Sequence, residues 1–586
     1  MNVIYQQVFP RTLDALLNEY AQESARGTRL TAWLFENTAD RLAAQARLAQ
    51  FGVQAQLHSA YKPLVHYFLE SVDRENLEQV SIDYPVHPAA PANRFLLEAY
   101  PLAALIGPER IRFNGVPASE HCTYGVTLSY RDRPSVRAEV AAPNRLHTDH
   151  VGSTQLSPTG WLQVERTDGS RADARLETEY EALFAAAIGA VMAHPWGPTE
   201  PYFETLAICV TLPQRDQPLP FAHEVVSLSE ALHEDFYFSL LEVFQQRSGK
   251  ASGDRTLQPG QIMPEIRLRE GAATLEIGLR ALEDEEPVGP QQDLHQARAP
   301  LSMGQVRAEL AQISGEVFTA QTRSKRTVPA RYRKGTDAPV MISGGQHANE
   351  TSGVVGVLRA AQALNEREQA HFTLSPMENP DGYAAHQRLC VDNPRHMHHA
   401  ARYTAFGDDL EYRTGAPFEQ AIRHTALALT GAKLHINLHG YPSHEWTRPL
   451  NGYVPRNFGL WSVPKGFFLI LRHHSAWTSV ATAFIERVTL ALAEVPGLLQ
   501  ANAEQVALYQ IHAGQLDGFQ IINGFPCLIS IKEADVQAMP LTFITEYPDQ
   551  TLWDEAYVTS HTVQMHSVIA AYDTYQALVR EQVLPA

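Results

Sequence analysis

The sequence predicts an α/β fold for residues 300–586, preceded by a mixed α+β region. After residue 300, strand-like runs alternate with helix-like runs, which is typical of helices layered on a central sheet. Before residue 285, helical periodicity over residues 10–71 gives way to short alternating segments that are typical of strands. Residues 281–300 are acidic and then rich in Pro, Gly and Gln, without either periodicity, and this indicates a linker.

The C-terminal part divides into regular elements with clear patterns. A helix is expected near Glu350, because Val354, Val355, Leu358 and Ala361 recur at intervals of three and four residues. We also expect helices at 303–313, 417–431, 476–495 and 554–579, and strands at 316–324, 327–335, 338–343, 371–377 and 433–440.

The N-terminal region, residues 1–285, is less informative. The patterns predict a helix over Glu177–His194 and a possible division into subdomains at 1–75 and 100–285. Strands are expected at 124–130, 160–166, 204–210 and 273–282. The role of this region does not follow from its residues; substrate selection, partial cover of a cleft and subunit contact are all compatible with them.

Composition limits the class of partner and the compartment. Hydrophobic residues make up 44% of the 586 residues and charged residues 19%, as in ordinary globular proteins. The formal charge of −18 disfavours nucleic acid and anionic membranes as partners. We see no secretory signal and no apolar run long enough to span a membrane, and the cysteines (122, 209, 390 and 527) are too dispersed for a disulfide framework, so we expect a cytoplasmic protein with free thiols. The sequence does not indicate the oligomeric state.

A metal site is predicted where an apolar strand ends in a glycine turn. In VMISGGQHANETSG, His347 and Glu350 lie three residues apart as a helix begins, so both can reach one cation. Zinc accepts imidazole and carboxylate ligands, and a catalytic site needs a third protein ligand. In KLHINLHG, His435 and His439 share a strand face, and His439 is preferred because ligands gather at the carboxyl edge of such sheets.

Five segments then resemble one family in their order along the chain. They are GGQHANETSG, Asn379–Tyr383 (NPDGY), NLHGYPSHEW, YQIHAGQLDG and LTFITEYPD, and together they resemble the signature of zinc metallocarboxypeptidases, the carboxypeptidase A-like family, over about residues 300–586. The resemblance implies a three-layer α/β/α domain with a mixed central sheet. It also implies one zinc ion per chain, held by His347, Glu350 and His439, and hydrolysis of peptide bonds.

Two glutamates compete for the role of general base, which takes a proton from water and passes it to the leaving amine. Glu546 ends the strand-like run 541–545 and resembles the family's catalytic glutamate in position. Glu533 lies closer along the chain to Asp517, nearer to the family's usual separation. We favour Glu546, which requires an inserted hairpin through residues 522–525.

The remaining site residues follow from the resemblance. Arg388 resembles the family's oxyanion arginine, and Arg402 occupies about the stretch where an arginine would bind a terminal carboxylate, although the family's Asn-Arg pair is not present as such. Tyr509 would cap the substrate, and Asp517 would line the side-chain pocket. The nearby histidines 396, 398 and 399 are expected to be solvated loop residues.

Three functions remain open at this point. The first is a zinc peptidase that removes terminal residues from peptides. The second is a zinc-dependent deacylase or amidase acting on N-acyl amino acids or peptidoglycan-type fragments, which the uncertain carboxylate clamp permits. The third is a binding protein with a vestigial zinc site, disfavoured because the ligand, tyrosine and glutamate candidates all occur together.

Overall fold

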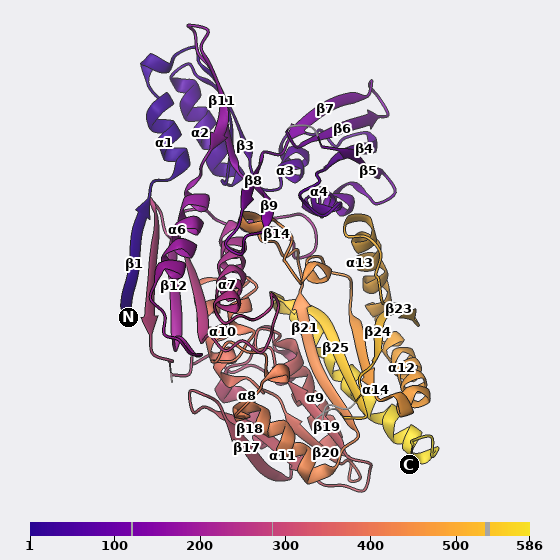
Figure 1. Ribbon diagram of the computed structural model, residues 1–586. Coiled ribbons are helices and arrows are strands. Elements are labelled where there is room, and N and C mark those ends of the chain that lie inside the picture. The colour runs from indigo at the N-terminus through magenta and orange to yellow at the C-terminus, as the bar shows by residue number, and fades with distance from the viewer. Residues whose placement is uncertain (119–120, 284, 534–538, 586) are drawn as a thin grey trace.

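A nine-stranded sheet forms the centre of the C-terminal part in the computed structural model, which describes residues 1–118, 121–283, 285–533 and 539–585 (Figure 1). The strand order is β17-β18-β20-β19-β21-β25-β22-β24-β23. The bounds are β17 (Glu316–Gln321), β18 (Thr327–Arg333), β19 (Val340–Gly344), β20 (Phe372–Ser375), β21 (Leu434–Pro442), β22 (Phe468–His473), β23 (Gln520–Ile522), β24 (Phe525–Ile531) and β25 (Leu541–Gln550).

The sheet is mixed, as the resemblance implied. Strands β20, β19, β21 and β25 run parallel to one another, and β22 pairs antiparallel with β25. Strands β23 and β24 form an antiparallel hairpin in which Ile522 pairs with Phe525. This is the insertion that the choice of Glu546 requires.

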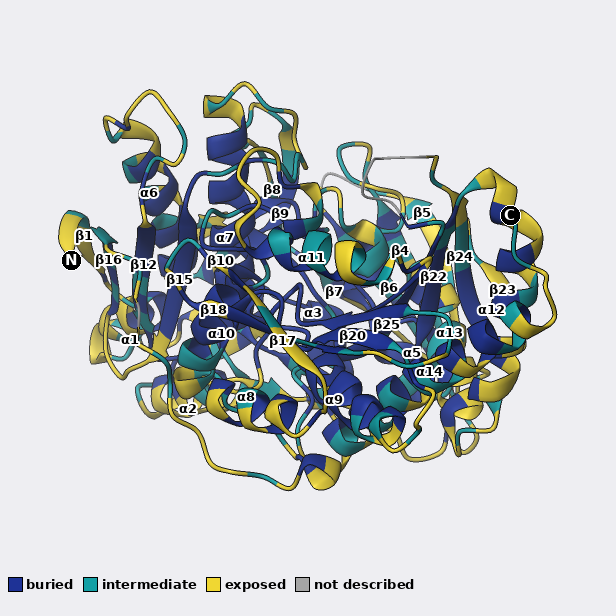
Figure 2. Cartoon of the chain, turned by 90° about the horizontal axis from the view of Figure 1, so that it is seen from below, coloured by how far each residue is buried: buried dark blue, intermediate teal, exposed yellow. Residues whose placement is uncertain are grey.

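Helices cover both faces of the sheet, which confirms the three-layer arrangement (Figure 2). One face packs its alternate apolar residues, such as Ile436 and Phe543, against α8 (Met303–Ala311), α9 (Ser352–Asn365), α12 (Thr478–Ala493) and α14 (Asp554–Arg580). The other face carries α11 (Ala421–Thr430), whose Ala426 packs against Met341. The remaining helices of this part are α10 (Pro380–Asp392) and α13 (Leu498–His512).

Within its described residues, the N-terminal region forms three four-stranded sheets. The first is β1 (Asn2–Phe9), β16 (Ala273–Arg280), β12 (Thr205–Leu212) and β15 (Gln261–Leu268). The second is β11 (Arg171–Leu176), β10 (Gly160–Glu165), β2 (Arg29–Leu34) and β3 (Gln54–Ser59), and the third is β5 (Ile111–Pro117), β4 (Leu77–Val86), β6 (Thr123–Tyr130) and β7 (Val136–Ala141). Two pairs of short strands complete the region: β8 (Asn144–Thr148) with β9 (Thr154–Pro158), and β13 (Gln217–Pro218) with β14 (Val225–Val226).

The helices of this region depart in part from expectation. The helix expected over Glu177–His194 is α6 (Glu179–Ala193), but residues 10–71 include strands β2 and β3 as well as helices. The sheets do not follow a division near residue 75, because β1 pairs with β16 and β2 pairs with β10. The other helices are α1 (Thr12–Tyr20), α2 (Thr38–Gln50), α3 (Pro63–Glu70), α4 (Arg94–Glu98), α5 (Leu102–Ile106) and the unexpected α7 (Leu228–Arg247).

The two parts of the chain share a hydrophobic core. Phe236, Leu240 and Phe244 of α7 belong to the same buried cluster as Trp446 and Leu450 of the C-terminal part. The contacts of α7 with residues 399–401 and 449–451 place this N-terminal helix beside the loops at the carboxyl end of the central sheet. No described helix is long and apolar enough to cross a membrane.

Candidate metal centre

His347, Glu350 and His439 converge at the carboxyl edge of the sheet. His347 lies in the turn after β19, Glu350 just before α9, and His439 in β21. The Nδ1 atoms of His347 and His439 each lie 2.9 Å from an oxygen of Glu350. Among the described residues, these three form the one group of His, Cys, Asp or Glu side chains with ligand atoms close enough to hold a metal ion.

The donor set fits a divalent cation. The two Nδ1 atoms are 3.0 Å apart and face one carboxylate, with all three residues at most 5% exposed. Burial raises the pKa of Glu350, but His347, Arg402 and His439 outweigh it and hold that pKa well below its usual range. A cation would satisfy both imidazole lone pairs and the carboxylate together, and two nitrogens with one oxygen are a set that zinc accepts.

His435, the competing ligand, does not join the cluster. It lies four residues before His439 on the same strand face, but its Nε2 is 2.7 Å from the hydroxyl of Ser343. The strand rises about 3.3 Å per residue, so the separation of roughly 13 Å keeps the two imidazoles apart.

Polar groups hold the cluster in place, and sequence reasoning missed most of them. Asp409 Oδ2 lies 3.4 Å from His347 Nε2, while Gln346 donates to the other oxygen of Asp409 at 2.9 Å. The Gly440 amide donates to Glu350 at 3.1 Å. A carboxylate behind a ligating imidazole fixes its orientation and tautomer. The acidic pair in FGDDLEY was the available signal for Asp409.

Glu546 lies beside the cluster. It is the direct register partner of His439 in the parallel pair β21 and β25, and it is 7% exposed. Burial and then the charge of Glu350 raise the pKa of Glu546 well above its ordinary value, although Arg402 and Lys465 oppose the shift. Glu533, in contrast, is exposed and accepts a hydrogen bond from the Ser475 amide at 3.0 Å.

The two predicted arginines lie in different surroundings. Arg402 donates from Nη1 to Glu350 Oε1 at 2.8 Å, so its guanidinium touches a cluster residue. Arg388, on α10, forms ion pairs with Glu283 and Glu265 at the contact with the N-terminal region. The structure therefore brings Arg402 to the cluster, whereas Arg388 is held by carboxylates elsewhere.

Tyr509 and Asp517 are not brought to the three ligands. Tyr509 is buried on α13 against Leu97 and Tyr100 of the N-terminal region, and Lys465 Nζ lies 5.5 Å from the centre of its ring. Burial, followed by the charge of Asp517, raises the pKa of Tyr509 to about 12. Asp517 itself lies exposed in the loop that follows α13.

Loop histidines near the site are buried against helix α7, contrary to the expected solvated loop. His399 Nδ1 lies 2.6 Å from Glu234, and His396 Nε2 lies 2.6 Å from Asp216. His444, farther along the chain, pairs with Glu230 at 2.9 Å. These contacts place carboxylates of the N-terminal region among the loops that follow the metal ligands.

The comparisons with known proteins give weak likenesses. No family model and no curated protein matches the chain. Carboxypeptidase A from Helicoverpa armigera is 8% identical, with 59% of this chain and 95% of that chain covered and a TM-score of 0.32. A metallo-carboxypeptidase from Burkholderia cenocepacia is 15% identical, with 53% and 77% covered and a TM-score of 0.29. One from Pseudomonas aeruginosa is 14% identical, with 53% and 73% covered and a TM-score of 0.28. Likenesses this weak assign no activity, and function must be argued from the site.

Proposed function

We propose that this protein is a zinc-dependent metallopeptidase that hydrolyses peptide bonds as a carboxypeptidase. One zinc ion per chain would be held by His347, Glu350 and His439. The convergence of these three side chains from separate segments, with Glu546 as the register partner of His439, is the observation that carries the proposal. Four free cysteines support a reducing compartment, and we propose the cytoplasm.

Bound zinc supplies a polarised carbonyl and a bound water whose pKa is lowered toward about 7. Within the chain, Glu546 is the carboxylate placed to take a proton and return it to the leaving amine. Its position supports this role, because Glu546 is the register partner of His439 and is only 7% exposed.

Arg402 is the proposed donor to the charge that develops on the carbonyl oxygen. Its side chain is 15% exposed and its guanidinium is held by Glu350, so it needs little reorganisation during the reaction. In this proposal the role that the sequence suggested for Arg388 passes to Arg402. Tyr509 and Asp517 remain the proposed substrate-binding residues, Tyr509 from α13 beside Lys465 and Asp517 from the exposed loop that follows α13.

A deacylase or amidase remains the second candidate. A free terminal carboxylate is best bound by an arginine that donates two parallel hydrogen bonds. One N–H group of Arg402 already donates to Glu350, so fewer donors remain to bind a terminal carboxylate. This favours substrates without such a carboxylate.

Metal analysis and a matched peptide set test the proposal. We expect about one zinc per purified chain, and hydrolysis of free-ended peptides that is lost on chelation and restored by zinc. C-terminally amidated versions of the same peptides should be poor substrates. Equal cleavage of both sets would move the assignment to the amidase, and the absence of stoichiometric zinc would reject both enzymes.

A further inference from the structure

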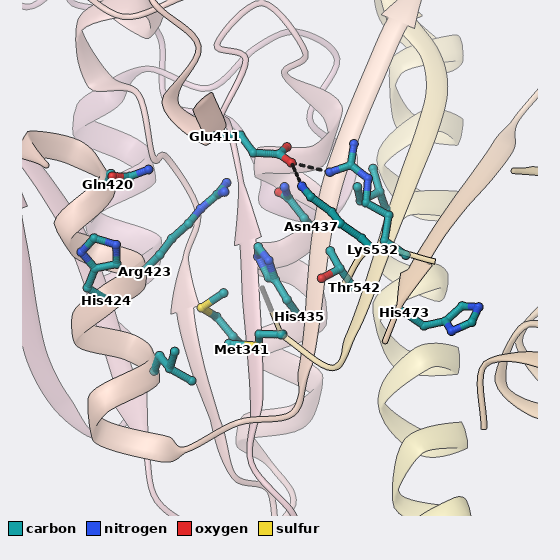
Figure 3. A pocket seen from close by; sticks show the side chains of 14 residues that line it. Met341, Glu411, Gln420, Arg423, His424, His435, Asn437, His473, Lys532 and Thr542 are labelled. Atoms are coloured by element: carbon teal, nitrogen blue, oxygen red, sulfur yellow. Dashed lines mark hydrogen bonds and ion pairs between the residues drawn. The ribbon is translucent and has the colours of Figure 1, made fainter. Parts of the chain in front are cut away.

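A cavity of about 100 Å³ lies on the sheet face that carries His439 (Figure 3). Its floor comes from alternate residues of two parallel strands, His435 and Asn437 of β21 and Thr542 and Ile544 of β25. Residues of α11 and Glu411, from the short 3₁₀ helix Leu410–Tyr412, form part of its wall.

The cavity lies next to the proposed active site along strands β21 and β25. Asn437 is two residues before His439, and Ile544 is two residues before Glu546, so each pair lies on one face of its strand. Two residues of a strand span roughly 7 Å, about the length of a short side chain. Gln346 joins the two places, because it donates to Asp409 and accepts from Asn437 at 3.0 Å.

Positive charge exceeds negative charge around this space. Arg472 and Lys532 both donate to Oε1 of Glu411, the one carboxylate among the described lining residues. Arg423, the third cation of the lining, is paired with Glu378 outside it, at 2.5 Å. One positive charge of the Arg472 and Lys532 pair is therefore not balanced by a lining carboxylate. A guanidinium has five N–H donors and an ammonium three, so both groups retain donors for a second carboxylate.

The size and the walls suit one short side chain. Binding sites for drug-sized ligands occupy about 300–1,000 Å³, several times this volume. Met341, Leu427 and Ile544 line the cavity and offer apolar surface for methylene groups. In Figure 3, Glu411 and Lys532 lie near Asn437, and Met341 lies beside His435. An aspartate or glutamate side chain combines methylene groups with a carboxylate for the cations.

We propose that this cavity binds the acidic side chain of the residue on the leaving-group side of the scissile bond, so that aspartate or glutamate is released. The inference rests on the proposed function for its position beside the reacting bond. Its chemical basis is independent of that function: an unbalanced pair of cations, Arg472 and Lys532, in the lining of a cavity of about 100 Å³.

Matched substrates test the selectivity. N-acyl dipeptides that end in Glu, Gln, Leu or Lys are compared with the zinc-loaded, full-length protein. We expect kcat/KM for Glu to exceed that for the isosteric Gln by roughly tenfold to a hundredfold, because a carboxylate gains charge-assisted hydrogen bonds that an amide lacks. Equal rates for Glu and Gln, or a preference for Leu or Lys, would overturn the inference.

Variants connect the selectivity to the cavity. Arg472→Met and Lys532→Met should each lower the Glu-to-Gln ratio about tenfold, because each removes a cation that would bind the carboxylate. Arg487→Met removes a more exposed ion pair that does not line the cavity, with Glu581 at 2.9 Å, and serves as the control that leaves the ratio unchanged. A ratio that stays the same in both cavity variants contradicts the proposal.

A binding measurement separates this inference from the proposed function. Calorimetry with free glutamate, glutamine and lysine on the metal-free and zinc-loaded protein should show tightest binding for glutamate, weakened in Arg472→Met. If no peptide is hydrolysed but this binding order holds, the cavity assignment stands and the peptidase assignment falls. If peptides are hydrolysed without an acidic preference and glutamate binds no better than glutamine, only the cavity assignment falls.

Discussion

His439 and Glu546 face each other across the parallel strands β21 and β25, one as a metal-ligand candidate and the other as the proposed base. Paired residues of neighbouring strands project to the same side of a sheet, about 5 Å apart. Backbone hydrogen bonding therefore fixes the separation of these two functions more firmly than loops would. This arrangement makes the roles of both residues directly testable.

The first prediction concerns the base. Glu546→Gln should keep about one zinc per chain and lose activity by roughly 10²–10⁴-fold, the usual contribution of a positioned acid or base. Glu533→Gln is the matched control and should stay active, since Glu533 is exposed and bonded to Ser475. Steady-state kinetics with metal analysis decides the matter, and the reverse pattern would assign the role to Glu533.

The second prediction concerns the third ligand. His439→Asn should abolish stoichiometric zinc binding, because only two protein ligands remain and a catalytic zinc site needs three. His435→Asn should keep zinc, since that imidazole faces Ser343 instead. Metal content after dialysis measures both, and loss of zinc in His435→Asn alone would show that the ligand had been chosen wrongly.

The third prediction compares two arginines. Arg402→Met should lower kcat by about 10²–10³-fold, as removal of a donor to developing charge does elsewhere. Arg388→Met should change kcat little, because its partners are Glu283 and Glu265. Zinc content and melting temperature must be measured on both variants, since Arg402 also neutralises Glu350. If Arg402→Met retains zinc and its kcat is unchanged, the assignment of Arg402 as the donor to the developing charge is wrong.

The fourth prediction concerns acid stability. His512 is fully buried, with Nε2 accepting from the Ala103 amide at 3.2 Å, and burial lowers its pKa from 6.5 to about 4. The unfolded chain therefore binds a proton that the folded chain does not. As pH falls from 6.5 to 4, the free energy of unfolding should decrease by up to about 1.4 kcal/mol per pH unit from this group.

Urea titrations at several pH values measure that slope. His386 and His561 have the same lowered pKa of about 4 and add to it. In His512→Gln, the free energy of unfolding should depend less steeply on pH between pH 6.5 and 4, because unfolding takes up about one proton fewer. This holds whatever the change in stability at neutral pH. An unchanged slope would show that His512 is not held neutral in the folded state.

The fifth prediction concerns a glycine beside the site. A Cβ at Gly440 would lie 1.9 Å from Asp549 Oδ1 and 2.9 Å from the Tyr547 carbonyl. Gly440→Ala should therefore cost about 1–3 kcal/mol of stability through overpacking. Gly189→Ala, at a helix position with no neighbour within 4 Å of the added Cβ, is the control and should be neutral or stabilising. Equal denaturation midpoints for the two variants would contradict the predicted clash.

Much of the C-terminal part could be predicted because its signals are local. The helix after Glu350 and strand β21 follow from the spacing of apolar residues, and both emerged close to their expected bounds. The ligand group His347, Glu350 and His439 could be proposed because two of its members lie three residues apart and the third ends a strand. These three side chains come together only if β19 and β21 are neighbours in the sheet. The alternation of strands and helices favours such a parallel sheet, with ligands at the carboxyl ends of its strands.

Helix α7 could not be predicted because it has no solvated face. Every residue from Ser229 to Gln245 is buried, including Glu234 and Glu242, so the helix lacks the polar side that usually marks a surface helix. Its buried carboxylates are neutralised by distant residues, among them His444 and Arg448. The ion pairs of Arg388 with Glu265 and Glu283 could not be predicted either, because spacing along the chain does not show which face of α10 points toward the metal cluster.

The common core of the two parts bears on any attempt to use residues 300–586 alone. Such a fragment would present Trp446, Leu450 and Leu389 to water, and would leave Arg448 without Glu242. Exposed apolar patches of this kind lead to association, and a stranded buried charge destabilises what remains. The first half of the chain thus supplies part of the core that residues 300–586 need, and we expect a fragment of residues 300–586 to fold poorly without it.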